Sequence, residues 1–92
     1  MSAIVKMYST RFCPYCMHAR MLLENKGVEF EDIAVDGDAE RRQEMMTLSG
    51  RHTVPQIWVG DTHVGGYDDL AALEQQGALD KLLEMAPQAS WQ

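Results

Sequence analysis

The sequence has few cysteines, little positive charge and no long apolar run. Only two of its 92 residues are cysteines. A chain of this length can bury enough surface to fold without disulfides, and a single pair could not form a disulfide framework. We therefore expect one domain over residues 1–92, in which the two cysteines carry chemistry rather than hold the fold together.

The shortage of positive charge excludes some partners. Eight Lys and Arg residues against fourteen Asp and Glu give a net charge of −6, which argues against nucleic-acid or anionic-membrane binding. No apolar run approaches the roughly 18 residues of a membrane-spanning helix, and the N-terminus shows no basic segment leading into an apolar one. A close cysteine pair in an otherwise cysteine-free chain is typical of a reducing compartment. We expect a cytoplasmic protein.

The apolar pattern predicts an α/β domain. Strands are predicted over 3–8, 29–35, 54–59 and 62–64, and helices over 14–26, 39–48, 68–75 and 78–85. Asp38 is the expected N-cap of the second helix, and Asp68 or Asp69 that of the third. The first two strands flank a helix long enough for a right-handed crossover, whereas the Gly60-Asp61 turn predicts an antiparallel hairpin. The element order is β-α-β-α-β-β-α, with a last helical piece.

The C-terminal residues follow these elements. Residues 86–92 are expected to form a flexible tail. Trp91 is the exception there, because an exposed Trp in a tail is unusual. It is expected either to pack back on the domain or to make a self-association contact.

The most informative motif is Cys13-Pro14-Tyr15-Cys16, at a predicted strand-to-helix junction. Residues three apart on a helix lie on the same side, so both sulfurs can approach each other. The first cysteine lies where backbone N–H groups are unpaired and stabilise a thiolate, and Arg11 is a candidate neighbouring cation. Cys16, one turn deeper, is expected to have the higher pKa and to act as the second thiol.

Three other interpretations of the pair remain open. The pair could be half of a zinc site, but a structural zinc site has four ligands. Besides acidic residues, the chain offers only His18, His52 and His63 as the others. On a helix His18 would point away from the pair. A c-type haem would need His directly after Cys16, where Met17 stands. The pair could also be two small core residues, although Pro and Tyr between them fill a core poorly.

A second motif, Thr53-Val54-Pro55, opens the predicted third strand. A Pro that merely begins a strand in the trans form is the simpler interpretation. A cis bond there would instead turn backbone groups outward to pair with an extended peptide.

A third motif is Gly65-Gly66-Tyr67-Asp68-Asp69, two flexible glycines followed by carboxylates at a predicted helix start. Helix capping by one of the carboxylates is the simpler interpretation. The functional alternative is that the helix N-terminus binds a ligand carboxylate while an Asp side chain binds an ammonium group.

Together these three motifs resemble the dithiol glutaredoxins, closely the bacterial glutaredoxin 3 type. The resemblance extends from about residue 4 to residue 83. It implies a thioredoxin-like fold with a four-stranded mixed sheet, in which the Pro of Thr-Val-Pro is cis and faces the cysteines. It also implies that Cys13 is the nucleophile and Cys16 the resolving thiol. The glutathione-binding residues that it implies are Arg11, Tyr15, Thr53, Val54, Pro55, Gly66, Tyr67, Asp68 and Asp69.

The chain departs from the family pattern at two positions. Many members have Lys three residues before the first cysteine, where it meets the glycyl carboxylate of glutathione, but here that residue is Thr10. Either Arg11 supplies this charge, or Arg51 and Gln56 carry more of it. Tyr67 stands where some relatives have a third cysteine.

The resemblance implies a glutathione-dependent thiol–disulfide oxidoreductase that reduces protein disulfides and protein–glutathione mixed disulfides. It implies glutathione as co-substrate, no permanently bound cofactor or metal, and a monomer. The protein substrates, including whether ribonucleotide reductase is one, are not specified by the sequence. One alternative is an iron–sulfur module in which two chains each donate Cys13, although Pro14 and Cys16 disfavour that assembly. Another is a glutaredoxin-like protein reduced by thioredoxin reductase.

Overall fold

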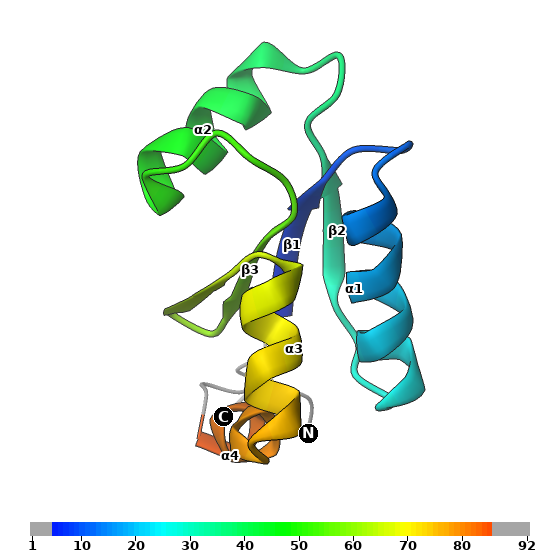
Figure 1. Ribbon diagram of the computed structural model, residues 1–92. Helices are drawn as coiled ribbons and strands as arrows, with labels where there is room; N and C mark the ends of the chain where they lie inside the picture. The colour runs from blue at the N-terminus through cyan, green and yellow to red at the C-terminus, as the bar shows by residue number, and fades with distance from the viewer. Residues whose placement is uncertain (1–4, 86–92) are drawn as a thin grey trace.

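The computed structural model describes residues 5–85 and contains a four-stranded sheet with four helices (Figure 1). The expected tail, Trp91 and the first residues of the first predicted strand lie outside this range. The strands are β1 (Val5–Ser9), β2 (Glu31–Ala34), β3 (Gln56–Val59) and β4 (Thr62–Gly65). The helices are α1 (Pro14–Asn25), α2 (Ala39–Ser49), α3 (Tyr67–Gln75) and α4 (Ala78–Met85).

The sheet is mixed, with strand order β2-β1-β3-β4. β1 and β2 are parallel, as the connecting helix predicted, whereas β3 is antiparallel to both β1 and β4. The predicted element order is therefore confirmed. One boundary matters for the site: β3 begins at Gln56, so Thr53, Val54 and Pro55 precede the strand rather than open it.

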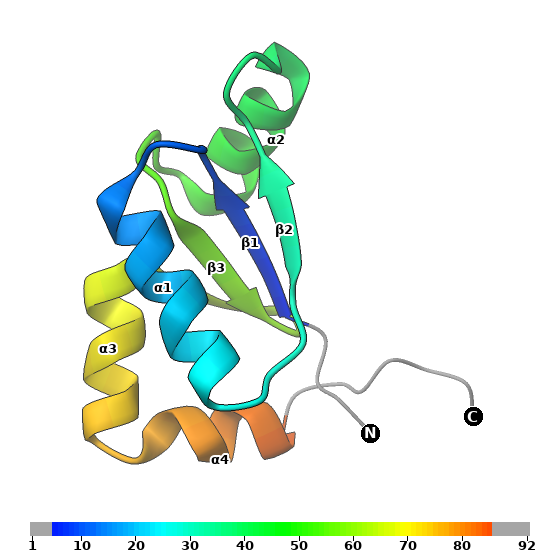
Figure 2. The same ribbon diagram turned by 90° about the vertical axis from the view of Figure 1, so that its right-hand side faces the viewer.

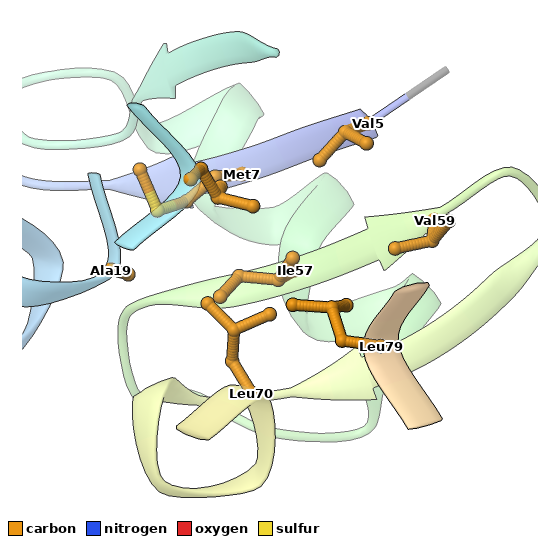
Figure 3. Packing of buried hydrophobic residues seen from close by; sticks show 8 residues of the cluster. Val5, Met7, Ala19, Ile57, Val59, Leu70 and Leu79 are labelled. Atoms are coloured by element: carbon orange, nitrogen blue, oxygen red, sulfur yellow. The ribbon is translucent and has the colours of Figure 1, made fainter. Parts of the chain in front are cut away.

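The helices cover both faces of the sheet. α1 and α3 lie side by side on one face, and α2 lies on the other (Figures 1 and 2). The larger core cluster lies between the sheet and α1, α3 and α4 (Figure 3). Its buried members are Val5, Met7, Ala19, Leu23, Ile57, Val59, Leu70 and Leu79. A second cluster of Tyr8, Ile33, Val35 and Met45 packs under α2.

Local sequence explains where α2 begins and ends. The Asp38 carboxylate accepts a hydrogen bond from the backbone N–H of Arg41 over 3.1 Å, which confirms Asp38 as the N-cap. Gly50 ends the helix in a left-handed conformation, with φ of 71°. None of the helices within residues 5–85 has the length and apolar character needed to cross a membrane.

Candidate active site

The two cysteines lie at the start of α1, one at its cap and one in its first turn. Cys13 is the N-cap residue, and its sulfur accepts a hydrogen bond from the backbone N–H of Cys16 over 3.3 Å. Pro14 follows at the start of the helix, where a missing N–H costs nothing. Cys13 is partly exposed, Cys16 is fully buried, and both are free thiols. An incoming disulfide can therefore reach the sulfur of Cys13 first.

The buried position of Cys16 changes its acidity. Burial raises the pKa of the Cys16 thiol to about 12, and the hydrogen bond with Cys13 adds to this rise. The backbone of Thr10 and the positive charge of Arg20 act in the opposite direction. Cys16 is therefore a protonated thiol at neutral pH. Its role as the second thiol stays a prediction.

The Val54–Pro55 peptide bond is cis and lies against the cysteines. The carbonyl oxygen of Val54 accepts a hydrogen bond from the Cys13 sulfur over 3.9 Å. This is the arrangement that the family resemblance implied. The simpler interpretation from the residues alone, a trans Pro at the start of a strand, is wrong.

Beside this contact is a hollow of about 210 Å³, which we call the groove. Segments far apart in the chain form it: the first turn of α1, the loop before β3 and the start of α3. The groove is lined by Tyr15, Arg51, Thr53, Val54, Pro55, Gln56, Gly66, Tyr67, Asp68 and Asp69. Eight of the nine glutathione-binding residues implied by the resemblance are among these ten.

The ninth residue, Arg11, is not brought to the groove. Its Nε atom donates to the Asp36 carboxylate over 2.9 Å, and its side chain is 74% exposed. The guanidinium also lies over the Phe12 ring, 5.9 Å from its centroid. The Arg11 hydrogen bond lowers the pKa of Asp36, in keeping with an ion pair at the end of β2. The cation that lines the groove is Arg51 instead.

The start of α3 differs from the sequence prediction. Gly66, rather than Asp68 or Asp69, is the N-cap residue. Asp69 lies in the first turn, and its Oδ2 accepts a hydrogen bond from the backbone N–H of Gly66 over 3.0 Å. The same oxygen pairs with Arg51 Nη1 over 3.3 Å. Asp69 caps the helix by reaching back, while Asp68 lies exposed on the groove.

Gly65 is required by this arrangement. Its φ is +115°, and a Cβ atom there would lie 2.2 Å from Asp69 Oδ2. That oxygen cannot move away without losing its bonds to Gly66 and Arg51. The sequence therefore needs a residue without a side chain directly before the helix cap.

We expect Gly65→Ala to lower the free energy of unfolding by about 1–3 kcal/mol, because it combines backbone strain with this overlap. Gly37→Ala is the matched control, since Gly37 has φ of +75° but no neighbouring atom within 4 Å of the place that an alanine methyl group would take. It should cost less, through backbone strain alone. Urea denaturation measures both, and equal losses would contradict the role given to Asp69.

A larger hollow of about 580 Å³ lies between β4, α3 and α4 and contains neither cysteine. His63 and Asp69 line it, so Asp69 borders both hollows. Within residues 5–85, no three His, Cys, Asp or Glu side chains lie close enough together to hold a metal ion.

Two residues of the groove, Arg51 and Gln56, flank the Thr53-Val54-Pro55 motif in sequence, but the sequence indicates them only as alternatives to Arg11. For His63 the sequence indicates no role beyond that of a candidate metal ligand. It contacts Gln56 across the hairpin, with 2.7 Å between His63 Nε2 and Gln56 Oε1. Only the register of β3 and β4 brings these two side chains together.

Comparison with known proteins identifies the family. The family model described as Glutaredoxin matches residues 5–64. The chain belongs to the glutaredoxin family. It is 57% identical over 79 residues to the glutaredoxin of Pseudomonas aeruginosa, covering 86% of this chain and 94% of that protein. It is 50% identical over 82 residues to glutaredoxin 3 of Escherichia coli, covering 89% and 99%.

Solved structures agree with the family assignment. The solution structure of a glutaredoxin from Brucella melitensis matches with a TM-score of 0.79 and 50% identity, covering 89% of each chain. The fold is thus the thioredoxin-like fold expected from the sequence. As a glutaredoxin, the protein is a thiol–disulfide oxidoreductase, and the geometry of Cys13 and Cys16 suits that chemistry.

Proposed function

We propose that this glutaredoxin uses glutathione to reduce protein disulfides and protein–glutathione mixed disulfides. The observation that carries the proposal is the position of the Cys13 sulfur. It is partly exposed at a helix N-terminus, contacts the Val54 carbonyl, and lies beside a groove with polar and charged walls. A glutathionyl group in this groove would place its sulfur next to an attacking thiolate.

In the monothiol route the Cys13 thiolate attacks the glutathione sulfur of a mixed disulfide. A bond forms between these two sulfurs, and the substrate protein leaves as a thiolate that takes up a proton. The thiolate of a second glutathione then attacks the bound glutathione sulfur. Oxidised glutathione leaves, and Cys13 returns as a thiolate.

In the dithiol route Cys13 attacks a protein disulfide and forms a mixed disulfide with the substrate. Cys16 then loses its proton and attacks the Cys13 sulfur, which releases the reduced protein and leaves a Cys13–Cys16 disulfide. The departing substrate thiolate can accept a proton in this step. Two glutathione molecules return the pair to its dithiol form.

The groove suggests how glutathione would be held. The backbone of Thr53 and Val54 would pair with the cysteinyl part as an added strand, and the Tyr15 ring would pack on the ligand. The γ-glutamyl carboxylate would meet the N-terminus of α3 at Gly66. Its ammonium group would meet Asp68, since the Oδ2 of Asp69 already bonds to two groups.

We propose Arg51, rather than Arg11, as the cation for a glutathione carboxylate. Arg51→Gln should raise the KM for a glutathionylated peptide about fivefold with little change in kcat. It removes the charge-assisted contact between the glutathione carboxylate and a side chain that is half exposed. Arg11→Gln is the control and should leave KM within about twofold. Steady-state kinetics measure both, and a larger effect in Arg11→Gln would restore the expectation from the sequence.

The reductant itself tests the proposal. Turnover of a glutathionylated peptide should occur with glutathione, glutathione reductase and NADPH. It should not occur when thioredoxin reductase and NADPH replace the glutathione system. The opposite pattern would assign the protein to the glutaredoxin-like proteins that thioredoxin reductase reduces.

A further inference from the structure

Gln56 is a fully buried residue of the groove wall that hydrogen-bonds to the loop before β3. The Gln56 side chain is fully buried, and its Nε2 donates to Thr53 over 3.1 Å to the carbonyl oxygen and 3.2 Å to Oγ1. Because the carbonyl can only accept, this contact fixes which end of the Gln56 amide is nitrogen. The amide oxygen of Gln56 therefore points the other way.

That oxygen meets His63 of β4. The distance from His63 Nε2 to Gln56 Oε1 is 2.7 Å. Since the amide oxygen can only accept, His63 Nε2 must carry the proton. The result is a directed chain of hydrogen bonds, in which His63 donates to Gln56 and Gln56 donates to Thr53.

The surroundings of His63 hold its ring in place. The ring stacks on Trp58 with centroids 4.6 Å apart, and Trp58 in turn meets Tyr8 edge-on at 5.4 Å. The charged groups facing His63 are Arg51 and Asp69. Burial, followed by the charge of Arg51, lowers the pKa of His63 and favours the neutral ring, while Asp69 acts in the opposite direction.

The chain of hydrogen bonds acts on a single peptide plane. The carbonyl of Thr53 and the N–H of Val54 belong to the same rigid, planar unit and point in opposite directions when the bond is trans. Only the Val54–Pro55 bond is cis within residues 5–85. Holding the Thr53 oxygen from behind therefore fixes the direction of the Val54 N–H, a backbone donor in the groove segment beside Cys13.

We propose that His63 is a positioning residue for glutathione binding, which orients the Thr53–Val54 peptide through Gln56. The inference rests on the proposed function, because it concerns the ligand of the same groove. Without the His63 donor, the buried Gln56 oxygen has lost its partner, and the amide is free to turn away from Thr53. His63 itself does not line the groove, so it acts without touching the ligand.

Two substitutions separate the hydrogen bond from the packing. His63→Phe keeps a ring over Trp58 but removes the donor, and it should raise the KM for a glutathionylated peptide about tenfold with kcat within about twofold. His63→Gln restores an N–H at similar reach and should return KM to within about threefold of the unmodified protein. Equal KM values for the two variants, or a lower kcat with unchanged KM, would overturn the proposal.

Leu79→Val controls for a general loss of stability, because it removes a core methylene on α4. It should lower the unfolding temperature without changing KM. If it raises KM as much as His63→Phe does, the effect of His63 is structural and the proposal fails.

A second measurement needs no variant. Nitrogen NMR of the His63 ring at pH 7 should show a proton on Nε2, and a neutral ring protonated only at Nδ1 would overturn the proposal. The result of this measurement does not depend on whether the proposed function is correct. If the unmodified protein does not turn over with glutathione, the proposed function fails, while the ring spectrum still reports whether the His63–Gln56 bond exists.

Discussion

Replacing Cys13 by serine should abolish both reactions, with a loss in kcat/KM of at least about 1,000-fold, because no other sulfur can take the attacking role. Cys16 is fully buried, and its pKa is raised to about 12. The variant should fold normally. Serine is a favoured N-cap residue, and its hydroxyl can accept the hydrogen bond that the Cys13 sulfur accepts from the Cys16 N–H.

The measurement for Cys13→Ser is the glutathione reductase-coupled assay, run with a glutathionylated peptide and with a protein disulfide. Circular dichroism and the unfolding temperature confirm that the variant is folded. A folded variant that still removes glutathione from the peptide would show that Cys13 is not the nucleophile.

Replacing Cys16 should abolish one of the two reactions and leave the other nearly unchanged. Removal of glutathione from a peptide should persist within about threefold, whereas reduction of a protein disulfide by the dithiol route should be lost, because nothing resolves the mixed disulfide. Serine at this fully buried position would need a hydrogen-bond partner. Cys16→Ala, which introduces no polar group, is therefore measured beside Cys16→Ser. Both variants should keep deglutathionylation and lose protein disulfide reduction.

The unmodified protein should also show a distinct pH dependence in the dithiol route. Burial, the largest cause of the raised Cys16 pKa, acts on this thiol whether or not Cys13 is in a mixed disulfide. The thiolate fraction should therefore rise about tenfold per pH unit between pH 7 and 9. Where resolution limits the rate, reduction of a protein disulfide should accelerate over this interval without a plateau. Stopped-flow measurements of the resolving step provide the test. A plateau below pH 9 would mean that Cys16 ionises more easily than its burial indicates.

The features that sequence predicted well are local ones. The i, i+3 spacing of Cys13 and Cys16 and the Pro14 between them predicted the start of α1, and in the structure the Cys13 sulfur caps that helix by accepting from the Cys16 N–H. Two of the strand pairings followed from connection lengths, since a helix between strands favours a parallel pair and a short turn favours a hairpin. The antiparallel β1–β3 pairing, which sets the strand order, was not predicted.

What sequence could not predict depends on partners distant in the chain. Arg11 lies two residues from Cys13, but Asp36 at the end of β2 draws its side chain away from the groove. The N-cap of α3 is Gly66 rather than a predicted Asp, because the Asp69 carboxylate accepts a hydrogen bond from the Gly66 N–H. In both cases the deciding group was a carboxylate whose position only the folded chain reveals.

The isomer at Pro55 and the position of His63 could not be predicted from neighbouring residues alone, for a related reason. The residues alone favour a trans bond before Pro55, and only the resemblance to a family implied the cis form that the structure contains. His63 follows Gln56 by seven residues, across the β3–β4 hairpin, and the contact depends on the strand register. No local pattern marks either feature.

The most direct test of the central claim is the identity of the covalent intermediate on Cys13. The Cys16→Ala variant is mixed with a glutathionylated peptide, quenched with acid and analysed by intact-mass and peptide mass spectrometry. The account predicts one glutathionyl group, attached to Cys13, and release of the peptide as a free thiol. Attachment of the peptide instead of glutathione would show that the groove does not select the glutathione sulfur, and absence of any adduct would contradict nucleophilic attack by Cys13.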